Sequence, residues 1–224
     1  MQGIREYVPV VEQSIIDELY LLAERLEGKT IQTINSTAVG GGVAEILNRM
    51  VPLFNELGVN MYWDLIKGGE NFFNVTKKFH NALHGRDEEI TDDMLDVFMD
   101  TSMQNVEHMK MNGDIILVHD PQPIVLIKNK HKLPDSHWIW RCHIDVSNPD
   151  RKLWRFLRQF MMDYDGCIFS APVFSQRLSD VDTGRQVPQF LISPSIDPLS
   201  TKNREIPPET IDDVLEKYGI SNDK

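Results

Sequence analysis

The sequence predicts an α/β fold built on a doubly wound, mainly parallel, Rossmann-like sheet. Segments with strand character alternate with amphipathic helical segments along the chain, as in folds with right-handed crossovers. One strand segment, IILV at 115–118, is a solid apolar run, which is typical of parallel strands covered on both faces. The length of 224 residues suits one large domain, and we expect a single domain over residues 1–224.

Hydrophobic spacing and turn residues place the individual elements. Ile15, Leu19 and Leu22 recur at helical spacing, which predicts an N-terminal helix over 13–26 with Ser14 as its N-cap. Short β-branched or apolar runs predict strands at 30–35, 61–66, 115–118, 138–144, 167–170 and 189–192. Helices are predicted at 43–57, with a kink at Pro52, and at 72–83, 92–109, 150–164 and 209–218.

Composition excludes several classes of protein. Lys and Arg number 23 against 34 Asp and Glu, a formal net charge of −11 that argues against general nucleic-acid binding. No apolar run approaches the roughly 20 residues that span a bilayer, and the N-terminus lacks the features of a signal peptide. Two cysteines, Cys142 and Cys167, make neither a disulfide scaffold nor a zinc module. We therefore expect a cytoplasmic protein with no nucleic-acid or membrane partner.

A glycine run follows the first predicted strand, in the segment NSTAVGGGVAEI at 35–46. Glycines between a strand and a helix let the backbone approach a ligand, and the helix N-terminus suits a phosphate. The spacing is not G-x-G-x-x-G, because Glu45 stands where the third glycine would be, and no G-K-[ST] follows. This disfavours a nicotinamide-dependent oxidoreductase and leaves two interpretations open, a tight turn and a phosphate cradle.

Two further motifs stand where predicted strands end, which is where ligands bind in open α/β sheets. In VHDPQP (118–123), prolines fix a loop that carries Asp120, which could grip sugar hydroxyls or cap the next helix. In WRCHID (140–145), Arg141, His143 and Asp145 would point the same way on an extended strand. A histidine there could contact a ligand or could be buried with a hydrogen-bond partner.

Two weaker candidates complete the set. The segment ISPSIDPLSTKN at 192–203 contains two prolines and predicts either a rigid loop near a site or an ordinary crossover. His80 and His84 are spaced like metal ligands on one helix face, but the sequence shows no third ligand, so a solvated face is favoured.

Five segments taken in order carry a family resemblance: NSTAVGGGVAEIL, LIKGGENFFNVTKKFHNALHG, VHDPQP, WIWRCHID and PSIDPLSTKN. Together they resemble the N-terminal half of trehalose synthase of the glycosyltransferring type. The resemblance spans about residues 4–218, is most specific in FFNVTKKFHNALHG, and is weakest over 174–188. The family has the GT-B architecture, in which two Rossmann-like domains face a cleft.

The resemblance implies a retaining glucosyl transfer from a nucleoside-diphosphate glucose to glucose, giving α,α-trehalose. On the family's pattern, Gly41 and Gly42 lie against the diphosphate or glucose of the donor. His143 touches the donor sugar and supports charge at the reacting centre, and Asp120 with Gln122 binds the acceptor glucose. His143 and Asp120 are thus the expected catalytic residues. No cofactor and no tightly held metal are implied.

The resemblance also implies partners for the chain. GT-B enzymes of this group carry their main nucleotide-binding domain in the C-terminal half, and this sequence stops at Lys224, about where that half would begin. We therefore expect an acceptor-side domain without its C-terminal domain, inactive alone, that binds glucose and nucleoside-diphosphate glucose. An exposed cleft face predicts apolar contact with another chain, as in a homodimer. The alternatives are a trehalose phosphorylase N-domain and a non-catalytic sugar-binding or interaction domain.

Overall fold

A parallel sheet of six strands organises the part of the chain that the computed structural model describes, residues 3–175, 178–179, 183–203 and 205–220. The strands are β1 (Thr30–Asn35), β2 (Asn60–Leu65), β3 (Ile115–His119), β4 (His137–Arg141), β5 (Gly166–Phe169) and β6 (Gln189–Leu191). Their order is β2-β1-β3-β4-β5-β6, and every neighbouring pair is parallel. This confirms the predicted Rossmann-like sheet, with a change of direction in strand order at β1 and β3.

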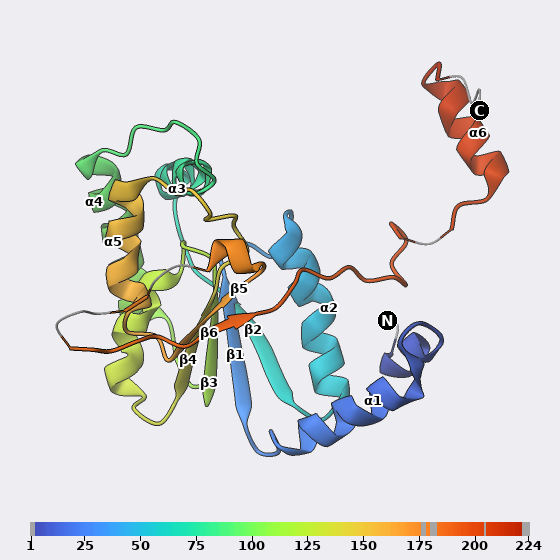
Figure 1. The fold of residues 1–224 in the computed structure, drawn as a ribbon, viewed down its shortest axis with the longest axis horizontal. Coiled ribbons are helices and arrows are strands. Elements are labelled where there is room, and N and C mark those ends of the chain that lie inside the picture. Colours follow the sequence, from blue (N-terminus) through green and yellow to red (C-terminus); the bar gives the residue numbers. More distant parts are fainter. Residues whose placement is uncertain (1–2, 176–177, 180–182, 204, 221–224) are drawn as a thin grey trace.

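Helices cover both faces of the sheet. They are α1 (Val8–Glu24), α2 (Gly42–Glu56), α3 (Glu70–Leu83), α4 (Asp92–His108), α5 (Arg151–Met161) and α6 (Pro208–Lys217), with short 3-10 helices η1 (Ile4–Tyr7), η2 (Ile124–Lys132) and η3 (Pro172–Phe174). In Figure 1, α3, α4 and α5 lie on one side of the sheet and α2 on the other, while α1 extends outward below α2. Because the helices cover the two faces of the sheet, the loops lie at the ends of the strands.

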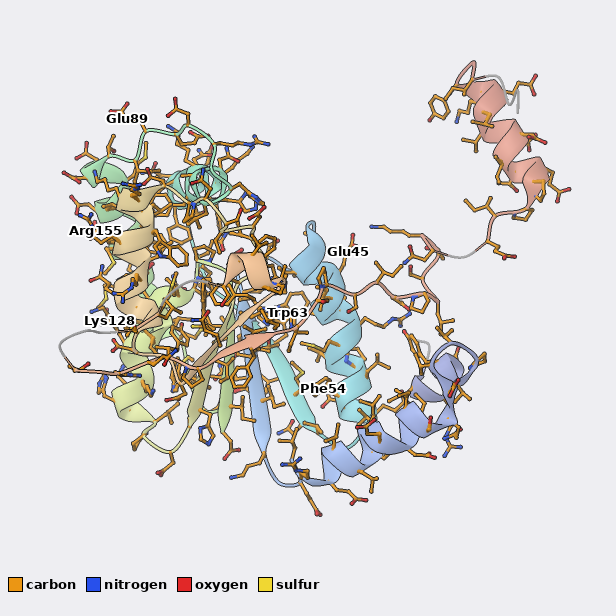
Figure 2. All side chains as sticks on the ribbon, viewed as in Figure 1. Glu45, Phe54, Trp63, Glu89, Lys128 and Arg155 are labelled. Atoms are coloured by element: carbon orange, nitrogen blue, oxygen red, sulfur yellow. The ribbon has the colours of Figure 1, made fainter. Side chains whose placement is uncertain are left out.

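Two hydrophobic clusters hold the layers together. The larger one packs Trp138 and Trp140 of β4, which are fully buried, against α3, α4 and α5, whose aromatic rings meet around Phe98. The smaller one joins Met61 of β2 to α2, where Phe54 packs against the sheet (Figure 2). Burial of both faces explains why β3 carries the solid apolar run at 115–118.

The element boundaries differ from prediction in two places, at the start of α1 and at the end of β4. Helix α1 begins at Val8, where Pro9 suits a first helical turn, but Glu12 divides it, and the part after Glu12 begins at Gln13 as expected. Ser14 therefore lies inside the helix and is not its N-cap, and the helix is interrupted at Glu12, whose φ is 67°. Helix α2 runs from Gly42 through Pro52 to Glu56 as one helix, which agrees with the predicted range of 43–57. Strand β4 ends at Arg141, three residues earlier than expected.

The ends of the chain carry exposed apolar residues. Helix α6 has no buried residue and lies away from the sheet (Figure 1), with Ile211 and Val214 exposed. On α1, Ile15, Leu19 and Leu22 are exposed as well. None of the helices in the described ranges combines the length and the apolar character that crossing a bilayer requires.

Candidate functional site

The predicted site residues gather at one edge of the sheet. The glycine run follows β1, Asp120 and Gln122 follow β3, and His143 follows β4. Strands β1, β3 and β4 are direct neighbours and run parallel, so all three loops leave the sheet at its carboxyl edge. The structure therefore brings together the loops that carry every site residue predicted from the sequence.

The glycine turn is bare main chain that is exposed to solvent. Gly40 and Gly41 have φ values of 75° and 85°, a region that favours glycine, and Gly41 is the N-cap of α2. A Cβ added at Gly40, Gly41 or Gly42 would meet no other atom within 4 Å. The first N–H groups of α2 have no side-chain cap, so the helix end stays open to a ligand.

The side chain of Asn35, the last residue of β1, holds the start of this turn through two hydrogen bonds. Its side-chain amide donates to the Thr37 carbonyl at 3.0 Å, and its carbonyl oxygen accepts from the Trp63 indole N–H at 2.8 Å. Asn35 is buried, whereas Thr37 is exposed. The start of the loop is thus fixed to β1 and β2, while the glycines beyond it remain free of side-chain contact.

Asp120 adopts a left-handed backbone conformation, with φ at 63°, directly after β3. Its N–H donates to the Arg141 carbonyl at 2.8 Å, and its own carbonyl accepts from the Trp140 indole N–H at 2.9 Å. Its carboxylate accepts the backbone N–H of His143 at 2.8 Å. Asp120 therefore joins the loops after β3 and β4. Helix η2 has Pro123 as its N-cap, which overturns the alternative that Asp120 caps it.

Burial raises the pKa of Asp120 to about 7, although the His143 N–H and the positive charge of Arg141 both act to lower it. A carboxyl group with a pKa near neutrality exists in both protonation states under ordinary conditions. Such a group can exchange a proton with a sugar hydroxyl as well as bind it.

His143 is half-buried beside a second histidine. Its Nε2 lies 2.9 Å from Nδ1 of His119, and the two rings are nearly parallel, with centroids 5.2 Å apart. Burial and then the charge of Arg141 lower the pKa of His143 to about 4, so its ring is neutral at pH 7. The alternative of a hydrogen-bonded histidine thus holds for one ring nitrogen and leaves the other available.

Asp145 does not join His143, contrary to the pattern of an extended strand. Because β4 ends at Arg141, His143 and Asp145 lie in a loop, and the Asp145 carboxylate accepts the N–H of Ser147 at 2.9 Å. The early end of β4 follows from long-range contacts, since the Asp120 carboxylate holds the His143 N–H. The sequence carries no signal of that contact.

Arg141 contributes a positive charge that has no ion-pair partner among the described residues. Its Nε is buried without a hydrogen bond, and no carboxylate of the described residues lies within 4 Å of its guanidinium. Burial lowers its pKa, while Asp120 opposes that effect. Gln122, between two buried prolines, likewise makes no side-chain hydrogen bond in the described part of the chain. Both side chains can therefore bind a ligand.

Two residues of the edge were missed by sequence reasoning. His119, the last residue of β3, and Thr33 of β1 are both buried, and Thr33 Oγ1 lies 2.8 Å from His119 Nε2. The signal that the sequence offered for His119 was a polar residue directly after an apolar strand. The same signal was used to select Asp120, but it was not applied to His119.

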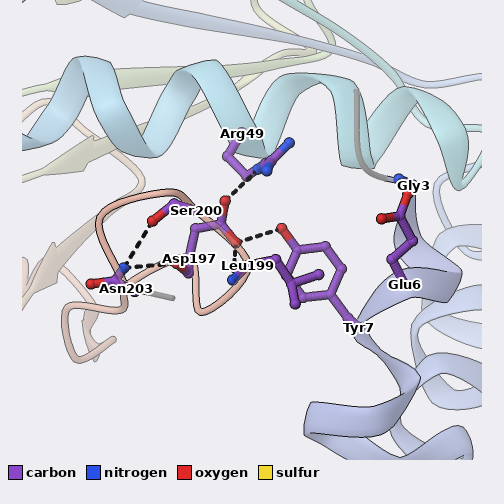
Figure 3. Close-up of polar contacts among 8 residues, drawn as sticks. All are labelled: Gly3, Glu6, Tyr7, Arg49, Asp197, Leu199, Ser200 and Asn203. Atoms are coloured by element: carbon purple, nitrogen blue, oxygen red, sulfur yellow. Dashed lines mark hydrogen bonds and ion pairs between the residues drawn. The ribbon is translucent and has the colours of Figure 1, made fainter. Parts of the chain in front are cut away.

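The loop after β6 is tied to α2, and none of its described hydrogen bonds involves His119 or His143. Asp197 accepts from Arg49 Nε at 2.7 Å and from the Tyr7 hydroxyl at 2.8 Å, as Figure 3 shows. The Asn203 side chain binds the Asp197 carbonyl at 2.7 Å and closes the turn. Residues 192–203 are thus tied to α2 and to η1, and these contacts do not decide between the two interpretations left open by the sequence, a rigid loop near a site and an ordinary crossover.

The other candidates contribute no chemistry at this edge. The His80 and His84 rings lie 4.6 Å apart, but the described residues contain no group of three His, Cys, Asp or Glu side chains that could hold a metal ion. A surface hollow lined by Met103, Gln104 and Lys132, among others, lies on α4 and η2. None of its lining residues belongs to the carboxyl-edge loops.

Comparisons with known proteins identify the family of the chain. The family model described as "Trehalose synthase, N-terminal domain" matches residues 33–176. The trehalose synthase of Pyrococcus horikoshii is 39% identical over 223 residues, 99% of this chain and 52% of that protein. The trehalose synthase of Rubrobacter xylanophilus is 35% identical, with 98% and 52% covered. The trehalose phosphorylase of Pleurotus sajor-caju is 26% identical, with 93% and 30% covered.

A solved structure shares the fold. The N-terminal domain of Candida albicans trehalose-6-phosphate phosphatase superimposes with a TM-score of 0.52 at 11% identity, covering 86% of this chain and 54% of that one. This likeness concerns the fold alone.

A parallel sheet with polar loops gathered at its carboxyl edge defines a Rossmann-like domain. The chain belongs to the trehalose synthase N-terminal domain family, which confirms the resemblance seen in the sequence. It spans about half the length of the trehalose synthases that it matches and corresponds to their N-terminal half.

Proposed function

We propose that this chain is the acceptor-side half of a retaining glucosyltransferase that makes α,α-trehalose from a nucleoside-diphosphate glucose and glucose. The observation that carries the proposal is the gathering of a bare glycine turn, Asp120 and a neutral His143 at one edge of the sheet. Family membership supports it, because relatives matched over nearly the whole chain are named trehalose synthases.

In this mechanism the protein positions two sugars and supports developing positive charge. Gly41 and Gly42 lie against the donor, while Asp120 and Gln122 hold the acceptor glucose. The bond from the anomeric carbon to the diphosphate breaks and a bond to the acceptor oxygen forms on the same face. The acceptor hydroxyl gives up its proton, which Asp120 can take because its pKa is about 7. His143 lies against the donor sugar. The rate is raised by the orientation of the two sugars and by electrostatic stabilisation of the charge that develops in the transition state.

The test needs a complementing C-terminal half. This chain is fused to the C-terminal half of the Pyrococcus horikoshii relative and incubated with nucleoside-diphosphate glucose and glucose. We expect trehalose and nucleoside diphosphate from the fusion, weak sugar binding without turnover from the chain alone, and loss of turnover in His143→Ala. A fusion that folds but forms no trehalose overturns the proposal.

Trehalose phosphorylase is the second candidate, since a protein of that name also matches 93% of the chain. The same fusion, given trehalose and phosphate, distinguishes the two by releasing glucose 1-phosphate. A non-catalytic sugar-binding domain would instead give calorimetric binding of glucose or trehalose without turnover in either assay. The proposed homodimer and a cytoplasmic location do not depend on these assays.

A further inference from the structure

We propose that Thr33 and His119 are positioning residues that hold His143 as a neutral ring with its hydrogen on Nδ1. His143 then presents a hydrogen-bond donor to the ligand at the carboxyl edge. The role toward a ligand rests on the proposed function, whereas the placement of the hydrogen does not.

Three side chains from three neighbouring parts of the sheet form a continuous chain of contacts. Thr33 Oγ1 lies 2.8 Å from Nε2 of His119, and Nδ1 of His119 lies 2.9 Å from Nε2 of His143. Thr33 is fully buried, His119 is 1% exposed, and His143 is half-buried next to the loop surface. This series of contacts therefore runs from the interior of the sheet to the edge where the site lies.

Each contact can contain only one hydrogen, so the two rings cannot both be protonated. A hydrogen bond between two imidazole nitrogens needs an N–H on one ring and a lone pair on the other. The charged groups that face the pair are Arg141, which disfavours added positive charge, and Asp120, which is partly protonated near pH 7. Burial lowers the pKa of His119 well below its usual value, which also favours the neutral ring.

Two directions of donation satisfy both contacts, and the Thr33 hydroxyl selects between them. If His143 donated inward, His119 would donate to Thr33, and the Thr33 O–H would have no acceptor, because its sole partner in the described part of the chain is His119. A buried donor without an acceptor is unfavourable, whereas an unused lone pair on a hydroxyl is tolerated. Donation therefore runs outward, from Thr33 to His119 and from His119 to His143.

Outward donation fixes the hydrogen of His143 on Nδ1, the nitrogen that is not held by His119. At that nitrogen His143 can donate to a sugar or phosphate oxygen but cannot accept a proton. The acceptor of a proton at this edge is then Asp120, so the two residues have different roles. A free histidine side chain favours its hydrogen on Nε2, so the fixed form depends on the contacts that hold it.

The direct test is nuclear magnetic resonance of the nitrogen-15-labelled chain at about pH 7. Long-range proton–nitrogen correlations distinguish the two neutral forms of histidine. We expect the Nδ1–H form at His143. In Thr33→Val, which loses the hydroxyl with little change of shape, we expect a shift toward the Nε2–H form, and in the control Thr33→Ser the original form.

A second variant guards against misfolding at Thr33. His119→Phe keeps a buried ring and removes both nitrogens, so Nε2 of His143 loses its donor and His143 should no longer be held in a single neutral form. An Nε2–H form of His143 in the unmodified chain overturns the proposal, as does an unchanged form in both Thr33→Val and His119→Phe.

The fusion used for the proposed function measures the consequence. Thr33→Val should lower kcat by about tenfold with little change in the KM of the acceptor, because a donor is misplaced while the acceptor contacts remain. Thr33→Ser should restore kcat. If the fusion forms no trehalose while the resonance pattern is as expected, the proposed function fails and the positioning role of Thr33 and His119 stands.

Discussion

Asp120 combines a left-handed backbone with a carboxyl group whose pKa burial raises to about 7. Asn tolerates this backbone conformation, and its side-chain oxygen can still accept the His143 N–H. The substitution Asp120→Asn therefore removes the charge while keeping the contact that joins the loops after β3 and β4.

We predict that the stability gain of Asp120→Asn over the unmodified chain grows with pH. The folded-state pKa lies above the unfolded value of about 3.9, so ionisation between about pH 4 and pH 7 destabilises the folded state. The gain should reach about 1.4 kcal/mol for each unit by which the pKa is raised, and should level off above pH 7. Urea unfolding at a series of pH values measures it.

Titration of His143 changes the free energy of unfolding with pH in the direction opposite to that of Asp120. Its pKa of about 4 lies below the unfolded value of about 6.5, so it destabilises the folded state as pH falls through that range. Both proteins carry this effect, so it should largely cancel in their difference. A difference that stays constant between about pH 4 and pH 8 would show that Asp120 is ionised normally.

Gly42 allows a test of the glycine turn without disturbing it. Its φ lies outside the left-handed region, and an added Cβ meets no atom within 4 Å, so Gly42→Ala should change the free energy of unfolding by less than about 1 kcal/mol. If the donor lies against this turn, the same change should raise the KM of the nucleotide sugar about tenfold in the fusion.

Gly41→Ala is the comparison for that experiment. Its φ of 85° strains any other residue, so we expect a loss of about 1–3 kcal/mol of stability together with any loss of affinity. A Gly42→Ala protein with unchanged KM would remove the turn from the donor site.

At the scale of elements, the sequence predicts the strands better than the residues that follow them. Apolar runs and helical spacing identify the strands and the major helices because burial determines both patterns. The end of β4 and the His119–His143 contact depend on side chains 23 and 24 positions apart in the sequence. No local sequence pattern indicates such pairs. The position of Asp120 and His143 at the carboxyl edge was therefore predictable, whereas their hydrogen-bond partners were not.

The loop over residues 192–203 is an element without regular structure, and its stability depends on Asp197. Burial raises the pKa of Asp197, but the hydrogen bonds from Arg49 and Tyr7 outweigh burial, so the pKa lies below its usual value. We predict that Asp197→Ala costs about 1–3 kcal/mol and that Tyr7→Phe costs about 1 kcal/mol. Amide hydrogen exchange should become faster in this loop in both variants.

The pH dependence of stability and the control variant Lys202→Ala both test the role of Asp197. A lowered pKa means that the contribution of Asp197 is present above its unfolded pKa of about 3.9 and is lost as pH falls through the folded value. Lys202→Ala removes the ion pair with Glu45 on the same loop, which is mostly exposed, and should cost less than about 0.5 kcal/mol. Equal effects of Asp197→Ala and Lys202→Ala would contradict the assigned role of Asp197.

At the scale of the whole molecule, the chain presents apolar side chains on an unpaired helix face. Ile15, Leu19 and Leu22 repeat at helical spacing on α1 and are 45%, 36% and 45% exposed. Exposed apolar residues that are contiguous on one helix face are typical of an interaction surface. We predict that the isolated chain forms a homodimer through this face of α1, and sedimentation at increasing concentration measures the change from monomer to dimer.

Leu19→Glu should shift that equilibrium to the monomer, since it places a charge in the centre of the apolar face. Gln13→Glu adds the same charge on the opposite side of α1, where the side chain is exposed, and should leave the dimer intact. If the fusion with a C-terminal half is monomeric while the isolated chain is dimeric, this face is covered by the added half. A chain that is monomeric at all concentrations would contradict the prediction and would leave α1 without a partner of its own kind.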